Sequence, residues 1–264
     1  MQIASTNRKV ATRGDVMADS AAIKEAREDL AAAYRLAVTH GFHEGICNHF
    51  SLAVPGTDDL FLLNPYGMHF SEITASNLLV VDKDGNKVEG EGFIEPTGFF
   101  IHSAIHRSRP DAKCVLHTHM PYALALTMVE GGRLEMADQN ACRFYDRIAY
   151  DDYFGGVALA TEEGDRIAAA LGDKRVMFMA NHGITVVGDT VAAAWEDLYY
   201  LHRACQAQVL AMSTGRPLKR VPDEMAKQVA EQVESEAMGA TANYRRHFAA
   251  MKRLLERDQP DYKH

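Results

Sequence analysis

The feature of this chain that most constrains its fold is the alternation of short apolar runs with longer helical stretches. The apolar runs have the length of β-strands and end in turns rich in Pro, Gly, Asn and Asp. The first helical stretch, at 21–40, is rich in strong helix formers and is followed by Gly41, a residue that commonly ends a helix. Because the two patterns intermix along the chain, the sequence predicts one α/β domain with a mixed sheet between helical layers.

The predicted elements divide the chain into three parts. Residues 1–20 are expected to form a flexible N-terminal arm, 21–215 the main domain, and 216–264 a C-terminal helical extension with one polar helix that runs to about 257. Within the main domain, strands are expected at HFSLAVPG, DLFLLNPYG, LLVVDKDGNKVEG, 113–118, 147–151, VMFMA and ITVVG, and helices at about 97–108, 121–129, 162–171 and 190–212.

Composition and charge exclude several classes of protein. Lys and Arg number 28 and Asp and Glu 36, so the formal net charge is −8, which argues against nucleic acid or an anionic membrane as a partner. No apolar run reaches the roughly 20 residues that cross a bilayer, and the N-terminus lacks the apolar region of a secretory signal. The four cysteines are widely spaced and are expected to be reduced. These features predict a cytoplasmic protein whose main partner is neither nucleic acid nor a membrane.

Three histidines have the pattern of a metal site. His117 and His119 end an apolar run, and side chains two apart on a strand point to the same face, so the two imidazoles form a chelating pair at a sheet edge. His182 lies in an Asn-His-Gly turn between two further strands, and such a turn can face the end of another strand. Three neutral imidazoles with an open position are the ligand set of a catalytic metal. The alternative is that these are hydrogen-bonded histidines beside a sheet.

A second pair of histidines competes for the same role. His102 and His106 are one helical turn apart, which is also chelating spacing. No Glu stands beside His102, so the zinc-protease helix pattern is absent, and the apolar residues between favour a helix packed on the sheet. The remaining histidines are interpreted as surface or packing residues: His40, His43, His49, His69, His202, His247 and His264.

Several motifs together resemble the class II aldolase/adducin family, and in their detail its adducin-like bacterial branch. They are CNHFS at 47–51, LNPYG at 63–67, SRPDAKCVLHTH at 108–119 and NHGITVVG at 181–188. The resemblance implies a three-layer α/β/α fold with a central mixed, largely antiparallel sheet. It also implies that His117, His119 and His182 bind a divalent metal, most often Zn²⁺, with Mn²⁺, Fe²⁺ or Co²⁺ as alternatives. Family aldolases are tetramers with sites between subunits, so a homo-oligomer, and a tetramer first, is expected.

The sequence departs from the aldolase pattern at the residue that moves protons. In the family's sugar-phosphate aldolases a catalytic Glu begins the helix ahead of His-x-His, and a gapless count places Gly98 at that position. Glycine cannot transfer a proton. Glu95, three residues earlier, could replace it only if the helix began at a different residue. Tyr145, which follows the His-x-His region, is the tentative candidate for proton transfer, and a packed aromatic residue is its alternative.

The expected substrate-binding residues also differ from those of the aldolases. Where the aldolases bind phosphate, this chain has Cys47-Asn48, Asn64-Pro65-Tyr66-Gly67 and Pro96-Thr97, with few hydroxyl donors and no Lys or Arg. A phosphate dianion needs several charge-assisted donors, so a small keto or hydroxy acid, or an aromatic acid, is the expected substrate. The residues expected to bind it are Asn48, Tyr66, Gly67, Thr97 and Gln139.

Two functions follow from this interpretation. The first is a metal-dependent lyase that breaks a C–C bond next to a carbonyl or carboxylate, by retro-aldol cleavage or by decarboxylation. The second is a catalytically silent, adducin-like binding or scaffold domain. Adducins depend on a long neck and a basic tail after this domain, whereas the segment after Gly215 has alternating charges typical of a solvated or subunit-packing helix. The retained metal histidines favour the lyase.

Overall fold

The computed structural model describes residues 20–236 and 242–264. Its centre is an eight-stranded sheet with the order β4-β3-β2-β1-β5-β8-β7-β6. All neighbouring strands are antiparallel except β6 and β7. The strands are β1 (His49–Ala53), β2 (Leu60–Leu63), β3 (Leu79–Asp82), β4 (Lys87–Glu89), β5 (Cys114–Thr118), β6 (Ile148–Asp151), β7 (Val176–Met179) and β8 (Gly183–Gly188). The predicted mixed, largely antiparallel sheet is confirmed.

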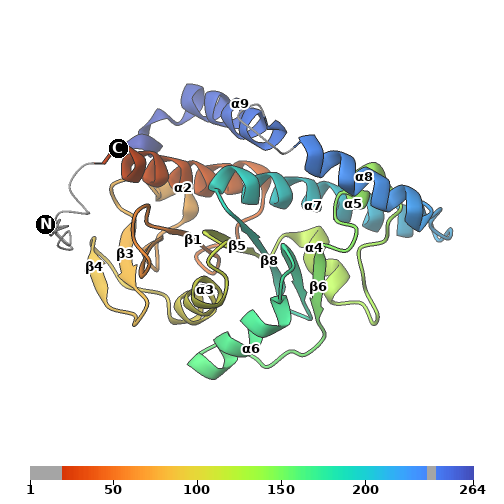
Figure 1. The fold of residues 1–264 in the computed structure, drawn as a ribbon, viewed down its shortest axis with the longest axis horizontal. Coiled ribbons are helices and arrows are strands. Elements are labelled where there is room, and N and C mark those ends of the chain that lie inside the picture. The colour runs from red at the N-terminus through yellow and green to blue at the C-terminus, as the bar shows by residue number, and fades with distance from the viewer. Residues whose placement is uncertain (1–19, 237–241) are drawn as a thin grey trace, which may run out of the picture.

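Helices cover both faces of this sheet (Figure 1). The long helices α2 and α7 lie on one face and α3 and α6 on the other, while α8 and α9 lie outside the first layer. The helices are α2 (Ala21–His40), α3 (Pro96–Ser108), α4 (Pro121–Thr127), α5 (Gln139–Cys142), α6 (Thr161–Leu171), α7 (Val191–Met212), α8 (Asp223–Glu236) and α9 (Asn243–Asp258), with short 3₁₀ turns η1 (Phe70–Glu72) and η2 (Pro260–Lys263). The arrangement is the predicted three-layer α/β/α fold.

Alternation along the strands explains why helices pack on both faces. In β5, Cys114 and Leu116 belong to the larger apolar core under α2 and α7, whereas Val115 belongs to the core under α3 and α6. Successive side chains of a strand point to opposite faces, so a strand with apolar side chains on both faces must be covered on both. The five residues of β5 are all buried.

Local signals fix the helix ends that matter for the site. The side chain of Ser20 accepts a hydrogen bond from the Ile23 amide at the start of α2, and Gly41 ends the helix with a left-handed φ of 70°. Glu95 caps α3, where its carboxylate accepts a hydrogen bond from the Gly98 amide. The helix therefore begins at Pro96, and Gly98 lies in its first turn.

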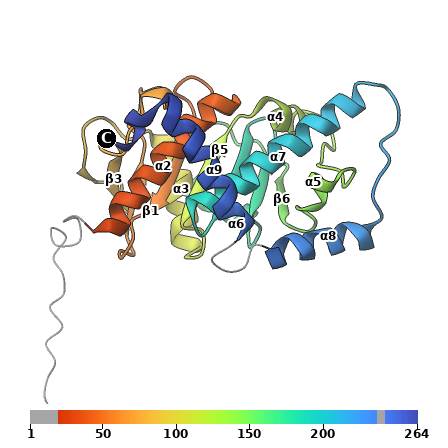
Figure 2. The ribbon, with the colours of Figure 1, turned by 90° about the horizontal axis from the view of Figure 1, so that it is seen from above.

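The C-terminal part differs from its prediction as one helix. Ala242 is extended, with φ −50° and ψ 139°, and α9 begins after it. From there the chain lies over α2 and α7 (Figure 2), and Phe248 and Leu255 are buried in the larger core. Among the described residues the extension thus contains two helices, α8 and α9, and the apolar face of α9 packs against its own domain. The short helix α5 was also not predicted.

Further predictions concern the N-terminal arm, the cysteines and membrane-spanning helices. The predicted arm at 1–20 lies, except for Ser20, outside the described residues. All four cysteines are free thiols, as expected. Among the described residues, no helix is both long enough and apolar enough to cross a bilayer.

Candidate metal centre

The strand order brings histidines from distant segments to one edge of the sheet. His117 is the penultimate residue of β5, and His119 directly follows its last residue. β8 runs antiparallel to β5, with Thr118 opposite Ile184, so the turn that precedes β8 lies beside the end of β5. That turn carries His182. The structure therefore brings the three predicted ligands together.

The turn before β8 has a backbone that few residues could form. Asn181 has a φ of 56°, in the left-handed region that Asn tolerates better than most residues. A Cβ atom on Gly183 would lie 2.6 Å from the Thr118 carbonyl oxygen and 2.7 Å from Cδ2 of His119. Only glycine allows this close approach, because both contacts would otherwise be steric clashes. The Asn-His-Gly sequence thus holds His182 against the end of β5.

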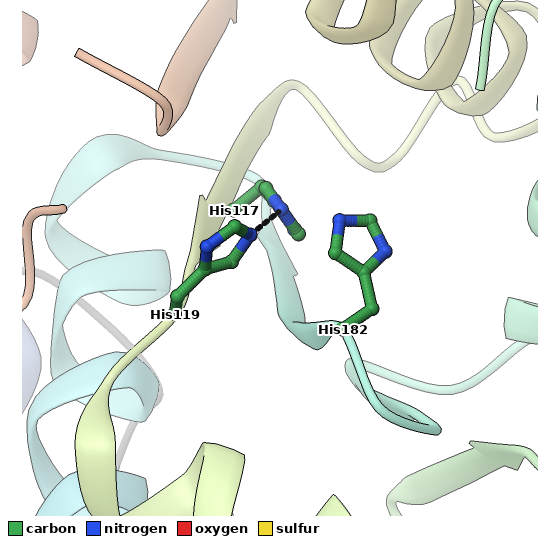
Figure 3. Close-up of side chains that lie close together, drawn as sticks. All are labelled: His117, His119 and His182. Atoms are coloured by element: carbon green, nitrogen blue, oxygen red, sulfur yellow. Dashed lines mark hydrogen bonds between the residues drawn. The ribbon is translucent and has the colours of Figure 1, made fainter. Parts of the chain in front are cut away.

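The three imidazoles face a common point (Figure 3). Nε2 of His117 lies 3.2 Å from Nε2 of His119, and the candidate ligand nitrogens of all three histidines lie within 4.8 Å of one another. Two nitrogens bound to one tetrahedral zinc ion at about 2.0–2.1 Å would be about 3.3 Å apart. The His117–His119 pair already has this spacing, and His182 lies slightly farther out.

The hydrogen bonds of the other ring nitrogens direct lone pairs towards this point. His119 Nδ1 donates to the Glu44 carboxylate. His117 Nδ1 lies 3.4 Å from Thr185 Oγ1, whose own proton is directed at the Met179 sulfur. A neutral imidazole carries its proton on one nitrogen only, so both Nε2 atoms carry lone pairs. Two facing lone pairs repel each other, and a cation between them removes the repulsion. The donor set therefore fits a divalent metal.

Burial supports the neutral form of these ligands. The pKa of His117 lies well below its ordinary value because the side chain is buried and other histidines surround it. Burial also lowers the pKa of His182 to about 4, with a smaller contribution from His119. Metals bind histidine in its neutral form. The Glu44 carboxylate adds the outer partner that commonly orients a ligating imidazole.

His49, which the sequence suggested to be a packing residue, lies beside the metal ligands. It stands opposite His117 in the β1–β5 register, and the two rings stack with centroids 4.8 Å apart. His49 is 2 % exposed, and burial lowers its pKa to about 3. Sequence analysis missed it because only the pairing of β1 with β5 places it there. The available signal was its position next to Asn48 in the CNHFS motif.

Glu95 and Gly98 lie on the other side of His49. The Glu95 carboxylate is 3.9 Å from His49 Nε2. A Cβ atom on Gly98 would lie 2.8 Å from Cγ of His49. Gly98 therefore makes room for the His49 ring, and the α3 cap places the Glu95 carboxylate at the site although the helix start is not shifted.

The competing pair, His102 and His106, is not brought to the metal ligands. His102 is buried and its Nε2 lies 2.8 Å from His49 Nδ1. His106 is farther along α3, where its Nδ1 lies 3.0 Å from the Ala112 carbonyl oxygen. Both side chains are held in a hydrogen-bonded chain under α3.

Four of the predicted substrate-binding residues lie at the same sheet edge as the metal ligands. Asn48 directly precedes His49, and both polar atoms of its buried amide lack a hydrogen-bond partner. Tyr66 and Gly67 follow β2, whose end pairs with the start of β1, and Tyr66 is 46 % exposed. Thr97 is in the first turn of α3, next to Gly98. An unpaired buried amide and an exposed phenol are suited to contact a ligand.

Tyr145 and Gln139 are not brought to this edge. β6 and β7 are parallel, and their ends at Asp151 and Met179 lie towards His182. Tyr145 precedes β6 and so lies at the opposite end of the sheet. Gln139 is exposed in α5, which packs against α7 and α8. Within one subunit neither residue lies beside the three histidines, and their suggested roles stay predictions.

The buried histidines predict how stability depends on pH. Burial lowers the pKa of His106 from 6.5 to about 4, so between these values the unfolded chain binds a proton that the folded chain does not. The free energy of unfolding should therefore fall as the pH drops from 6.5 to 4, by up to about 1.4 kcal/mol per pH unit for this residue. Urea unfolding at several pH values would measure the slope. His106→Gln should reduce it, and an unchanged slope would contradict the assignment.

Three imidazoles converging on the edge of a sheet between helical layers define an α/β protein with a candidate metal site. The chain belongs to the class II aldolase and adducin family, since the family's sequence model, "Class II Aldolase and Adducin N-terminal domain", matches residues 28–209. The resemblance found in the sequence motifs is thereby confirmed.

Three relatives illustrate the range of the family. The aldolase II superfamily protein from Pseudomonas syringae is 40% identical, with a TM-score of 0.86 over 93% of this chain and 98% of its own. The L-fuculose 1-phosphate aldolase from Glaciozyma antarctica PI12 is 26% identical, with a TM-score of 0.80 over 92% of this chain and 95% of its own. The decarboxylase NovR of Streptomyces niveus is 34% identical over 212 residues, which cover 80% of this chain and 77% of NovR.

Proposed function

We propose that this protein is a metal-dependent lyase that breaks a C–C bond next to a carbonyl or carboxylate of a small, non-phosphorylated keto or hydroxy acid. The observation that carries the proposal is the convergence of His117, His119 and His182, with two Nε2 lone pairs 3.2 Å apart. Relatives named as an aldolase and as a decarboxylase support the two C–C lyase chemistries.

The metal ligands and their neighbours have separate roles in this proposal. His117, His119 and His182 would hold the ion, with Zn²⁺ as the first choice for a set of neutral imidazoles. The bound ion would supply Lewis-acid polarisation of a carbonyl or carboxylate oxygen. The unpaired amide of Asn48 would orient a polar group of the substrate, because a buried amide without a partner is costly.

The absence of cationic residues from the aligned phosphate positions supports a non-phosphorylated substrate. Asn48, Tyr66 and Thr97 stand at or beside these positions, and none of the three can supply a positive charge. A carboxylate needs fewer charge-assisted donors than a phosphate dianion. A keto or hydroxy acid therefore matches this edge better than a sugar phosphate does.

We also propose that the protein is a homo-oligomer, with a tetramer as the expected state. The segment between β6 and α6 exposes Tyr153, Phe154, Val157 and Leu159, each more than half exposed. The ring of Phe154 lies 6.4 Å from that of His182. Clustered apolar side chains on a surface are typical of an interface, so a neighbouring subunit would pack next to the metal ligands.

The proposal predicts that turnover depends on the metal. Purified protein with one equivalent of Zn²⁺ should convert at least one member of a panel of 2-oxo and hydroxy acids. Removal of the ion with a chelator should abolish conversion, and Zn²⁺ should restore it. Release of an aldehyde would identify retro-aldol cleavage, and release of carbon dioxide a decarboxylation. A metal-loaded protein that converts no member of the panel, and whose stability does not change with chelation, would instead be a scaffold.

A further inference from the structure

A chain of buried polar side chains leads from the metal ligands to the far end of α3. Its members are His49, His102, Ser51 and His106, joined in that order, and it ends on the backbone carbonyl of Ala112. Ser51 and His102 are fully buried. Buried polar groups of this kind are satisfied by one another, so the direction of each hydrogen bond constrains the next.

The terminal carbonyl fixes the direction of the first two hydrogen bonds. A carbonyl oxygen only accepts, so Nδ1 of His106 must carry the proton that it donates over 3.0 Å to Ala112. Because His106 is neutral, its Nε2 has a lone pair and accepts from the Ser51 hydroxyl over 2.7 Å. Ser51 has one proton, and that proton is now used.

The same reasoning extends to His49. Ser51 Oγ must accept from Nδ1 of His102, 2.5 Å away. His102 Nε2 then has a lone pair and accepts from His49 Nδ1 over 2.8 Å. His49 is left with its proton on Nδ1 and a lone pair on Nε2. Burial supports the neutral form of each ring, since it lowers the pKa of His49 to about 3 and that of His106 to about 4.

The lone pair on His49 Nε2 faces a second acceptor. The Glu95 carboxylate oxygen lies 3.9 Å from it, and that carboxylate already accepts from the Gly98 amide. Two acceptors at this separation do not bond to each other, and one O–H group about 2.8 Å from each would share its single proton between them in a three-centre hydrogen bond. The His49 ring stacks on the metal ligand His117, so this gap adjoins the ion's position.

We propose that His49 and Glu95 form an acceptor pair that binds a hydroxyl group of the substrate, and that the His102–Ser51–His106 chain positions His49 with its lone pair towards that hydroxyl. The substrate class is then a hydroxylated 2-oxo acid, in which the carboxylate and ketone reach the metal and a hydroxyl farther along reaches the pair. The choice of a 2-oxo acid as substrate rests on the proposed lyase function. The hydrogen-bond directions that leave His49 with a lone pair on Nε2 do not.

The first test measures the histidine tautomers in the Zn²⁺-loaded protein. Nitrogen-15 NMR of histidine-labelled protein distinguishes a protonated ring nitrogen from one with a lone pair, and single histidine replacements assign the signals. His49, His102 and His106 are all expected to be protonated on Nδ1. A proton on Nε2 of His49 would overturn the proposal, whether or not the protein has lyase activity. The tautomers are read from the parent protein, and the replacements serve only to assign its signals.

The second test compares two probes that differ by one hydroxyl. Binding of 4-hydroxy-2-oxopentanoate and 2-oxopentanoate to the Zn²⁺-loaded protein would be measured by calorimetry, with the initial heat separated from any turnover. We expect the hydroxylated acid to bind about tenfold more tightly, as one added hydrogen bond implies. Equal binding would overturn the substrate assignment.

A matched pair of serine variants tests the role of the chain. Ser51→Ala removes the central hydroxyl, so the tautomer of His49 is no longer fixed and the preference for the hydroxylated acid should fall to a fewfold at most. Ser103→Ala removes a buried hydroxyl of α3, next to His102, that is bonded to Phe100 and Arg107 instead, and it should keep the preference. If both variants behave alike, the chain does not position His49. The two probes report binding and not turnover. If the protein converted no acid, the lyase proposal would be refuted, but the comparison of the two serine variants would still test the role of the chain.

Discussion

Replacing His119 with alanine is expected to abolish stoichiometric metal binding. His119 places its Nε2 atom 3.2 Å from that of His117 and is itself oriented by the Glu44 carboxylate. Loss of an outer-shell partner alone commonly costs 10–100-fold in metal affinity, so loss of a ligand should cost at least about 100-fold. Elemental analysis after dialysis against a fixed low Zn²⁺ concentration would measure the effect.

The control for this prediction is another histidine of the same chain. His264 is exposed at the C-terminus, and His264→Ala should keep one equivalent of metal. Glu44→Ala should give an intermediate loss, because it removes the orienting carboxylate and leaves all three imidazoles. Retention of a full equivalent by His119→Ala would refute the ligand assignment.

The second large effect is expected from Gly98→Ala. The added Cβ atom would lie 2.8 Å from Cγ and 3.0 Å from Cδ2 of His49, so the ring must move. Overpacking of a core site typically costs about 1–3 kcal/mol, although alanine is favoured over glycine in a helix by about 1 kcal/mol. The free energy of unfolding, measured in urea, should fall. The helix cap and the stacking on His117 would be disturbed at the same time.

A double-mutant cycle separates the clash from other effects of the substitution. In a His49→Ala background the added methyl group meets no ring, so Gly98→Ala should be neutral or stabilising there. A coupling energy of about 1 kcal/mol or more between the two positions would confirm the contact. Equal effects in both backgrounds would show that Gly98 does not make room for His49.

The three candidate metal ligands could be picked out from the sequence because their signals are local. The His-x-His pair owes its shared face to the two-residue period of a strand, and the Asn-His-Gly turn marks a tight bend. The fold class was predictable for the same reason, since helix and strand periods are readable over short windows. The convergence of the two motifs, which the pairing of β5 with β8 produces, was expected only from the family resemblance.

The positions of His49 and Tyr145 could not be predicted from local patterns. His49 lies next to His117 only because β1 pairs with β5 in one register, and a register between strands that are distant in sequence has no local signal. Tyr145 precedes β6, and nothing nearby in sequence indicates at which end of the sheet that strand begins. The functional meaning of Gly98 likewise depends on a contact across the α3–sheet interface.

The exposed apolar segment between β6 and α6, which is proposed as a subunit interface, would affect the metal site. Phe154 and the apolar residues that follow it lie close to His182. Burying them in an oligomer would exclude water from one side of the metal site and strengthen the electrostatic interactions within it. A monomeric protein would leave this side of the site open to solvent.

The most direct measurement is anomalous X-ray diffraction from crystals of the Zn²⁺-loaded protein, recorded on both sides of the zinc absorption edge. One strong peak is predicted about 2.0–2.1 Å from a ring nitrogen of each of His117, His119 and His182, with room beside it for a further ligand. A peak elsewhere, or one in contact with fewer than three of these imidazoles, would contradict the assignment of this edge of the sheet as the metal centre.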